Sequence, residues 1–243
     1  RRRNISPIVG DMELIFIRHG EPDWTGDEST LHDPPLTTRG RRQAELAAER
    51  LATDPDAPTD LVVSPALRSQ ETARPLAART GLSVHTVDDL VELGMPSRAG
   101  LTEAEGQQLQ DDSFSRPPAQ WWDGLDGGET FAHFHRRVTG ALEFVLADRG
   151  VRPDVDHEHL WSIDDPDRRI IIVAHGGTNA VSIGSLLGAA PAPWEWRRFT
   201  SNHASITRLR AMGFSGGFVW AMRAFNDQEH LPVEIRTRKR YLP

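Results

Sequence analysis

The sequence predicts an α/β fold, a three-layer α/β/α sandwich on a mainly parallel sheet. Short apolar runs rich in β-branched residues alternate with longer amphipathic stretches. This alternation is typical of parallel strands joined by right-handed crossover helices. The chain has 243 residues, of which 38% are hydrophobic and 26% charged. That length and composition are typical of one large globular α/β domain.

The first half of the chain supplies three of the predicted strands and two helices. The runs at 13–17 and 61–63 are almost entirely apolar, so we expect these strands to be buried on both faces. Proline near the first turn and glycine after the last turn, at Pro65 and Gly81, delimit the second helix. The elements expected here are strands at 13–17, 61–63 and 84–87, and helices from Thr37 or Thr38 to Ala52 and from near Pro65 to Arg79.

The middle of the chain, residues 88–126, interrupts this alternation. It is rich in glycine and proline and has one helical patch at 102–110, so we expect an insertion or lid over the sheet. Residues 152–168 are polar and rich in proline and aspartate, which predicts a surface loop. The remaining expected elements are helices at 129–148 and from Gly177 to Leu187, and strands at 170–174, 205–211 and 218–225, the last two near a sheet edge.

These elements predict a single domain over residues 12–231, with tails at 1–11 and 232–243. The chain has no cysteine, which excludes a disulfide scaffold, a thiolate zinc site and a cysteine nucleophile. No apolar run approaches the roughly 20 residues that a bilayer span needs. A net charge of −7 argues against non-specific binding of nucleic acid. We therefore expect a cytoplasmic protein that binds neither a membrane nor a nucleic acid.

Polar residues follow three of the predicted buried strands, at the point where each strand ends. In an open α/β sheet, ligands bind beyond the carboxyl ends of the strands, so we expect these residues to meet in one crevice. They are Arg18-His19-Gly20, Ser64-Pro65-Ala66-Leu67-Arg68 and His175-Gly176.

The residue types at these strand ends predict a phosphate ester as the ligand. Two arginines and two histidines form a strongly cationic set inside an acidic protein, and the planar guanidinium fork matches a pair of phosphate oxygens. The helices that follow Gly20, Ser64 and Gly176 would add partial positive charge from their N-termini. Because neutral imidazole can attack phosphorus, one histidine is a candidate nucleophile.

The same motifs resemble those of the histidine phosphatase superfamily, which is also called phosphoglycerate-mutase-like. The resemblance extends from Met12 to about Leu231 and implies the phosphoglycerate-mutase-like fold. Its motifs include, besides the three strand ends, Glu21, Asp33-Pro34-Pro35-Leu36-Thr37 to Gly40 with Gln43-Ala44, Gln70-Glu71-Thr72-Ala73, Leu90-Val91-Glu92, Gly127-Gly128-Glu129-Thr130, Val173-Ala174 before His175, and Asn226 to His230-Leu231.

The resemblance implies a role for each matching residue. His19 is the phosphorylated nucleophile. Arg18, Arg68 and His175 clamp the phosphate and neutralise charge on its oxygens in the transition state. Glu92 is the acid that protonates the leaving oxygen and later helps to activate water.

Two further residues are expected at the phosphate. Thr25 stands where the family often has asparagine, and its hydroxyl can still donate one hydrogen bond. Gly176 stands where the acid-phosphatase branch has aspartate, which argues against that branch. The chemistry of the family needs neither a metal nor a cofactor.

One departure from the family pattern leaves the identity of the acid open. The family's common Gly-x-Trp-Glu-Gly after the acid is absent, and the chain has Gly94-Met95-Pro96 there. Asp88, Asp89 and Glu103 are therefore alternatives to Glu92.

The resemblance implies a metal-independent phosphomonoesterase that acts on a small phosphorylated substrate through a phosphohistidine. One alternative is a mutase, which returns the phosphoryl group to a substrate hydroxyl in place of water. The other is a non-catalytic protein that binds a phosphorylated ligand, since a fold alone does not determine function. The physiological substrate and the oligomeric state stay open.

Overall fold

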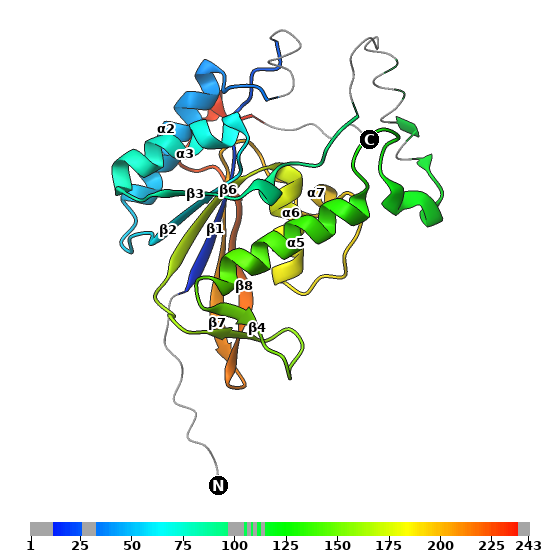
Figure 1. The fold of residues 1–243 in the computed structure, drawn as a ribbon. Coiled ribbons are helices and arrows are strands. Elements are labelled where there is room, and N and C mark those ends of the chain that lie inside the picture. The colour runs from blue at the N-terminus through cyan, green and yellow to red at the C-terminus, as the bar shows by residue number, and fades with distance from the viewer. Residues whose placement is uncertain are drawn as a thin grey trace.

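The computed structural model describes residues 12–25, 33–96, 105, 108, 111–112 and 115–237. At its centre is an eight-stranded sheet with the strand order β3-β2-β6-β1-β7-β8-β5-β4 (Figure 1). The strands are β1 (Glu13–Arg18), β2 (Asp60–Val63), β3 (Val84–Thr86), β4 (Val151–Pro153), β5 (Trp161–Ile163), β6 (Arg169–Ala174), β7 (Ile206–Phe214) and β8 (Gly217–Asp227).

The sheet is mixed rather than mainly parallel. Strands β3, β2, β6 and β1 run parallel to one another, whereas β7, β8, β5 and β4 continue the sheet in antiparallel order. The expected pairing of the first strand with the strand near Ile170 is confirmed, because Leu14 lies opposite Ile170. The carboxyl ends of β1, β2 and β6 therefore meet at one edge of the sheet.

Two hairpins form the antiparallel half and correct two expectations. Residues 152–168, expected to be a surface loop, contain most of the β4–β5 hairpin, because Trp161 is buried and pairs with Phe218 of β8. Strands β7 and β8 lie inside the sheet and not near its edge, since β1 pairs with β7 and the sheet continues beyond β8 with β5 and β4. Ser215 and Gly216 join β7 to β8 with two positive φ angles, as a type I′ turn requires.

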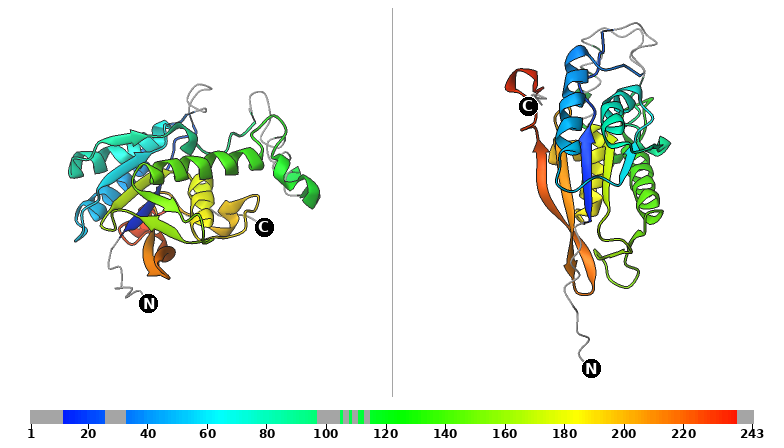
Figure 2. Two further views of the ribbon diagram at one scale, coloured as in Figure 1. Left: turned by 60° about the horizontal axis from the view of Figure 1, so that its bottom comes forward. Right: turned by 90° about the vertical axis from the view of Figure 1, so that its left-hand side faces the viewer.

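Helices pack on both faces of the parallel strands (Figure 2). The helices are α2 (Thr38–Ala52), α3 (Leu67–Thr80), α5 (Phe131–Ala147), α6 (Gly176–Leu186) and α7 (Glu195–Arg198), with the 3₁₀ turns η1 (Asp88–Leu90), η2 (Pro118–Asp123) and η3 (Val233–Ile235). Successive strand residues point to opposite faces. Leu14 and Phe16 of β1 pack with residues of α5 and α6. Ile15 and Ile17 pack with residues of α2 and α3.

Parts of the expected tails and lid lie outside the described residues. These are residues 1–11 and 238–243, and the helical patch at 102–110 with Glu103, of which only residues 105 and 108 are described. The beginning of the expected C-terminal tail is not free chain, because Gln43 Nε2 donates to the carbonyl of Ile235 at 2.7 Å. This contact fixes η3 to α2.

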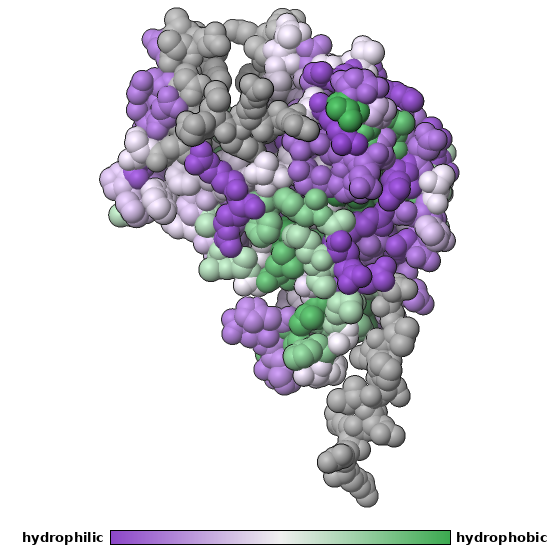
Figure 3. Space-filling view, turned by 180° about the vertical axis from the view of Figure 1, so that it is seen from behind, coloured by the Kyte–Doolittle hydropathy of each residue, from purple (hydrophilic) through white to green (hydrophobic). Residues whose placement is uncertain are grey.

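The face of β7 and β8 that is seen from behind carries a hydrophobic surface (Figure 3). On β7, Met212 is 42% exposed and Phe214 is 61% exposed.

Among the described residues, no helix combines the length and the hydropathy that crossing a bilayer requires.

Candidate active site

The structure brings His19 and His175 together at the carboxyl ends of two neighbouring parallel strands. His19 follows β1 and donates its backbone N–H to Ala174 at the end of β6, at 2.9 Å. The centroids of the two imidazole rings lie 5.2 Å apart, with 64° between the ring planes. Both side chains are buried. The sheet register therefore produces the pairing that the two motifs predicted.

His19 has a defined tautomer. Its Nδ1 lies 2.7 Å from the carbonyl oxygen of Gly20. Because a carbonyl only accepts, Nδ1 carries the hydrogen, and the neutral ring has its lone pair on Nε2. Burial lowers the pKa of His19 well below its usual range, and the charges of His175, Arg18 and Arg68 lower it further. His19 is therefore neutral at pH 7, with an unprotonated Nε2.

The second histidine is held by a serine and caps a helix. His175 is the N-cap residue of α6, and its Nε2 lies 2.8 Å from Ser64 Oγ at the end of β2. When the serine hydroxyl donates to Nε2, Nδ1 carries the hydrogen of the neutral ring. Burial, followed by the charges of Arg68, Arg18 and Arg137, lowers the pKa of His175 well below its usual range.

Two buried arginines flank the histidines. Arg18 Nη1 donates to the carbonyl of Ser201 at 2.6 Å. Arg68, in the first turn of α3, is 3.4 Å from Asp33 Oδ1 through Nη1 and 5.7 Å from the ring centroid of Trp24. Burial lowers the pKa of Arg68, although the nearby carboxylates of Glu92 and Asp33 oppose this effect. A guanidinium group keeps its charge under these conditions.

Nε of Arg68 and Nδ1 of His175 are buried and have no hydrogen-bond partner among the described residues. A buried polar group that lacks a partner costs about 1–3 kcal/mol. Both atoms can donate, so an oxyanion placed between the histidines and the arginines would satisfy them.

Glu92 lies beside this cluster, at the N-terminus of α6. Its Oε2 accepts from the backbone N–H of Gly177 at 2.9 Å, and its Oε1 accepts from that of Leu93 at 3.1 Å. A Cβ at Gly177 would lie 2.4 Å from Oε1, so only glycine leaves room for the carboxylate. The alternative acids Asp88 and Asp89 are exposed in η1.

The two remaining predicted residues differ in their position. Gly176 begins α6 and packs against Arg18, since a Cβ there would lie 3.5 Å from the guanidinium carbon. Thr25 is exposed, and its hydroxyl donates to Asp23 Oδ1 at 2.5 Å. The structure therefore does not bring the Thr25 hydroxyl to the histidines.

The sequence motifs did not identify His203, which belongs to the same cluster. Its ring centroid is 5.6 Å from that of His19, and its Nε2 lies 3.2 Å from Arg18 Nη2. His203 precedes β7, and β7 runs antiparallel to β1. The start of β7 therefore lies at the same edge as the end of β1. A polar residue just before a strand that pairs antiparallel to β1 is the signal that could have identified it.

Asp33 is a second residue whose role the motifs did not reveal. The N-cap residue of α3, Ala66, has no capping side chain, and Asp33 accepts from the backbone N–H of Leu67 at 2.9 Å instead.

The described residues contain no group of three or more histidine, aspartate or glutamate side chains that could hold a metal ion.

Comparison with known sequences identifies relatives that cover most of the chain. A probable phosphoglycerate mutase of Yersinia enterocolitica is 27% identical over 233 residues, 91% of this chain and 96% of its own length. Glucosyl-3-phosphoglycerate phosphatase of Mycobacterium tuberculosis is 31% identical over 189 residues, 74% of this chain and 78% of its own length. Phosphoserine phosphatase 1 of Hydrogenobacter thermophilus is 31% identical over 142 residues, 55% of this chain and 64% of its own length.

Comparison with solved structures finds proteins of similar fold that cover most of the chain. A protein described as mycobacterial hydrolase 2 has a TM-score of 0.67 at 26% identity, over 93% of this chain and 95% of its own. Mycobacterial glucosyl-3-phosphoglycerate phosphatase in complex with VO3 has a TM-score of 0.64 at 28% identity, over 89% of this chain and 100% of its own. The model of the histidine phosphatase superfamily, branch 1, matches residues 14–227. With the two histidines and two arginines at the sheet edge, this match shows that the chain belongs to branch 1 of the histidine phosphatase superfamily.

Proposed function

We propose that this protein is a phosphomonoesterase that transfers the phosphoryl group of a small phosphate ester to His19 and then to water. One observation carries the proposal: the buried imidazole of His19 donates through Nδ1 to Gly20, which leaves Nε2 unprotonated, and its ring centroid lies 5.2 Å from that of His175, with Arg18 and Arg68 also buried. The partnerless donors of Arg68 and His175 would bind phosphate oxygens. We propose a three-layer α/β/α sandwich as the scaffold, supported by the packing of helices on both faces of the sheet.

In the first step, Nε2 of His19 attacks phosphorus while the bond from phosphorus to the ester oxygen breaks. Arg18, Arg68 and His175 stabilise the charge on the three equatorial oxygens. Glu92 enters the step as the carboxylic acid and gives its proton to the departing alkoxide. The alcohol leaves, a phosphorus–nitrogen bond remains on His19, and Glu92 is now a carboxylate.

In the second step, Glu92 takes a proton from a water molecule whose oxygen attacks phosphorus. The phosphorus–nitrogen bond breaks and its electron pair returns to Nε2 of His19. Inorganic phosphate leaves, and Glu92 again carries a proton. The bond from Nδ1–H to Gly20 supports the positive ring of the phosphohistidine and keeps the lone pair on Nε2 at the end of the cycle.

The names of the relatives support a substrate class. Phosphoglycerate and phosphoserine are phosphorylated three-carbon acids, and glucosyl-3-phosphoglycerate is a sugar conjugate of one. We propose that this chain acts on a small phosphate ester of the same kind.

The test is a panel of phosphate esters that includes 3-phosphoglycerate, phosphoserine and a sugar phosphate. Inorganic phosphate and isomerised ester are measured in the same samples. We expect phosphate release from at least one ester with the native protein and none with His19→Ala. Isomer in excess over phosphate would establish a mutase instead. Phosphate binding with neither product would establish a non-catalytic binder.

A further inference from the structure

We propose that Arg137 and Glu129 are a positioning pair that holds Glu92 at the N-terminus of α6, where it can protonate the leaving oxygen. The inference rests on the proposed function, in which Glu92 is the proton donor. Among the described residues, no hydrogen bond joins Arg137 or Glu129 to His19, His175, Arg18 or Arg68. Both act through the backbone of the segment that carries Glu92. The side chains are 11% and 13% exposed.

The carboxylate of Glu92 is held by backbone groups of its own segment and of α6. The hydrogen bonds that Oε1 and Oε2 accept come from backbone N–H groups, those of Leu93 and Gly177. No described side chain donates to it. The orientation of the carboxyl group is therefore set by where the chain from η1 to Gly94 lies relative to the first turn of α6.

Arg137 holds three carbonyl groups of this segment from α5. Its Nη1 donates to the carbonyls of Asp89 at 2.7 Å and Val91 at 3.0 Å. Its Nη2 lies 3.4 Å from the carbonyl of Glu92 itself. The carbonyl of Val91 also accepts from Thr178 Oγ1 of α6, at 3.0 Å. One rigid guanidinium fork thus links the acid's backbone to α5, while α6 holds its carboxylate.

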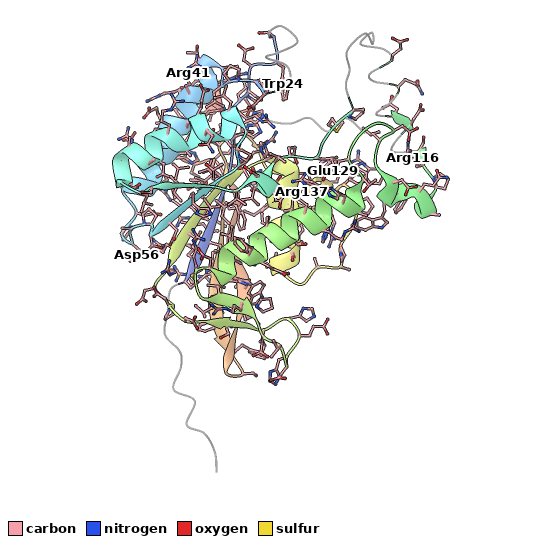
Figure 4. The ribbon with its side chains drawn as sticks, viewed as in Figure 1. Trp24, Arg41, Asp56, Arg116, Glu129 and Arg137 are labelled. Atoms are coloured by element: carbon pink, nitrogen blue, oxygen red, sulfur yellow. The ribbon has the colours of Figure 1, made fainter. Side chains whose placement is uncertain are left out.

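Glu129 completes the arrangement by binding both the arginine and the next part of the segment (Figure 4). Its Oε1 accepts from Arg137 Nε at 2.9 Å, and its Oε2 accepts from Arg137 Nη2 at 2.7 Å. Oε2 also accepts from the backbone N–H of Gly94 at 3.0 Å, while the N–H of Glu129 donates to the carbonyl of Gly94 at 2.7 Å. The segment is therefore fixed on both sides of Glu92.

The close approach of the two chains depends on Gly128. A Cβ there would lie 2.9 Å from the carbonyl oxygen of Gly94 and from Cδ of Pro96. Gly94 and Pro96 belong to the stretch that departs from the family pattern after the acid. The pair formed by Glu129 and Arg137 gives a physical reason why Glu92 can keep its place despite that departure.

The experiment compares an alkyl phosphate, which needs a proton donor, with 2,4-dinitrophenyl phosphate, whose leaving group needs little help. The variants are Arg137→Gln, Arg137→Lys and Glu129→Gln, with Glu92→Gln as the reference. Because a misplacement of about 1 Å can cost about 10²-fold, we expect Arg137→Gln and Glu129→Gln to lower kcat/KM on the alkyl ester by about 10²-fold. We compare kcat/KM because it covers the reaction only through departure of the leaving group, whereas kcat also includes the hydrolysis of phosphohistidine, which is common to both esters. On the aryl ester we expect a change below about threefold, and Arg137→Lys should recover part of the alkyl activity.

Arg149→Gln is the matched control. Arg149 is also buried, and it binds the carbonyl of Val145 and Asp60 Oδ1, both at 2.9 Å, at the opposite end of β2. We expect this variant to lower stability and to leave the ratio of the two activities unchanged. Activity on the aryl ester serves as the check that each variant folds and forms its phosphate site.

The outcomes separate the pair from the acid. Equal losses on the two esters in Arg137→Lys and Glu129→Gln would show a merely structural role and overturn the inference. A loss of activity on the alkyl ester alone in Glu92→Gln, with no such loss in Arg137→Gln or Glu129→Gln, would also overturn the inference. The proposed function would stand in that case. If Glu92→Gln itself lost both activities equally, the proton donor of the proposed function would be wrong, and the inference would fall with it.

Discussion

His203 can bond to Arg18 only as one tautomer of the neutral ring. A guanidinium only donates, so Nε2 of His203 must accept from Arg18 Nη2, and Nδ1 then donates to Thr237 Oγ1 at 2.7 Å. His203→Ala removes this acceptor. Hydrogen bonds to charged groups contribute about 1.5–3 kcal/mol, so we expect kcat/KM to fall about 10- to 100-fold.

Steady-state kinetics on alkyl and activated aryl phosphates checks the effect of His203→Ala. Arg18 is proposed to act on the phosphoryl group, so the loss should be the same on both esters, unlike the loss in Arg137→Gln. His203→Gln should recover part of the activity, because the amide oxygen can accept in place of Nε2. An unchanged kcat/KM in His203→Ala would mean that Arg18 keeps its position without the hydrogen bond to His203.

The residues that could be predicted from the sequence are those next to strands. His19, Ser64 and His175 directly follow β1, β2 and β6, and parallel strands end at the same edge of a sheet. His203 and Arg137 could not be predicted in this way. The first requires the antiparallel pairing of β7 with β1, and the second requires the contact of α5 with a segment 45 residues earlier.

At the scale of the elements, α3 depends on a cap from a distant loop. Asp33 accepts from the N–H of Leu67 through both carboxylate oxygens and lies next to Arg68. Loss of a capping side chain costs about 0.5–2 kcal/mol. We expect Asp33→Ala to lower the free energy of unfolding by about 1 kcal/mol and to weaken phosphate binding, because Arg68 sits in the same helical turn.

Urea unfolding and phosphate titration measure both effects of Asp33→Ala. Asp33→Asn keeps an oxygen that can accept from Leu67 but loses the charge beside Arg68. It should therefore keep most of the stability. Equal stability of Asp33→Ala and the native protein would contradict the capping role.

The elements that could be predicted are the ones with a strong local pattern. β1 and β6 are continuous apolar runs, and α3 ends at Gly81, which adopts a φ of 73° as a C-cap should. The β4–β5 hairpin has no such pattern, since most of its residues are polar and its strands are three residues each. Its place in the sheet comes from the pairing of Trp161 with Phe218, which is not visible locally.

For the whole molecule, the two buried histidines make stability depend on pH. The pKa values of His19 and His175 lie well below 6.5 in the folded protein, and the unfolded chain protonates them near 6.5. Below about pH 6.5 the unfolded chain therefore binds more protons. As the pH is lowered below 6.5, we expect the free energy of unfolding to decrease by about 1.4 kcal/mol per pH unit for each histidine, until the folded-state pKa is reached. Above pH 6.5 this contribution is fully present.

Urea unfolding at pH 7.5, 6.5 and 5.5 measures this dependence above the range where most carboxylates titrate. His175→Gln should show a smaller loss between pH 6.5 and 5.5 than the native protein. A free energy of unfolding that is the same at pH 7.5 and 5.5 would contradict the neutral, buried state of the two histidines.

The central claim is that Nε2 of His19 carries the phosphoryl group during the reaction. Its most direct test is to mix the protein with a ³²P-labelled ester, quench with alkali within the first turnover, and locate the label. Alkali is used because phosphohistidine is labile in acid. We predict labelled protein whose phosphate is on His19, as the Nε2 isomer by NMR, and no label in His19→Ala. Phosphate release by the native protein with no label on His19, or with label on Nδ1, would contradict the account.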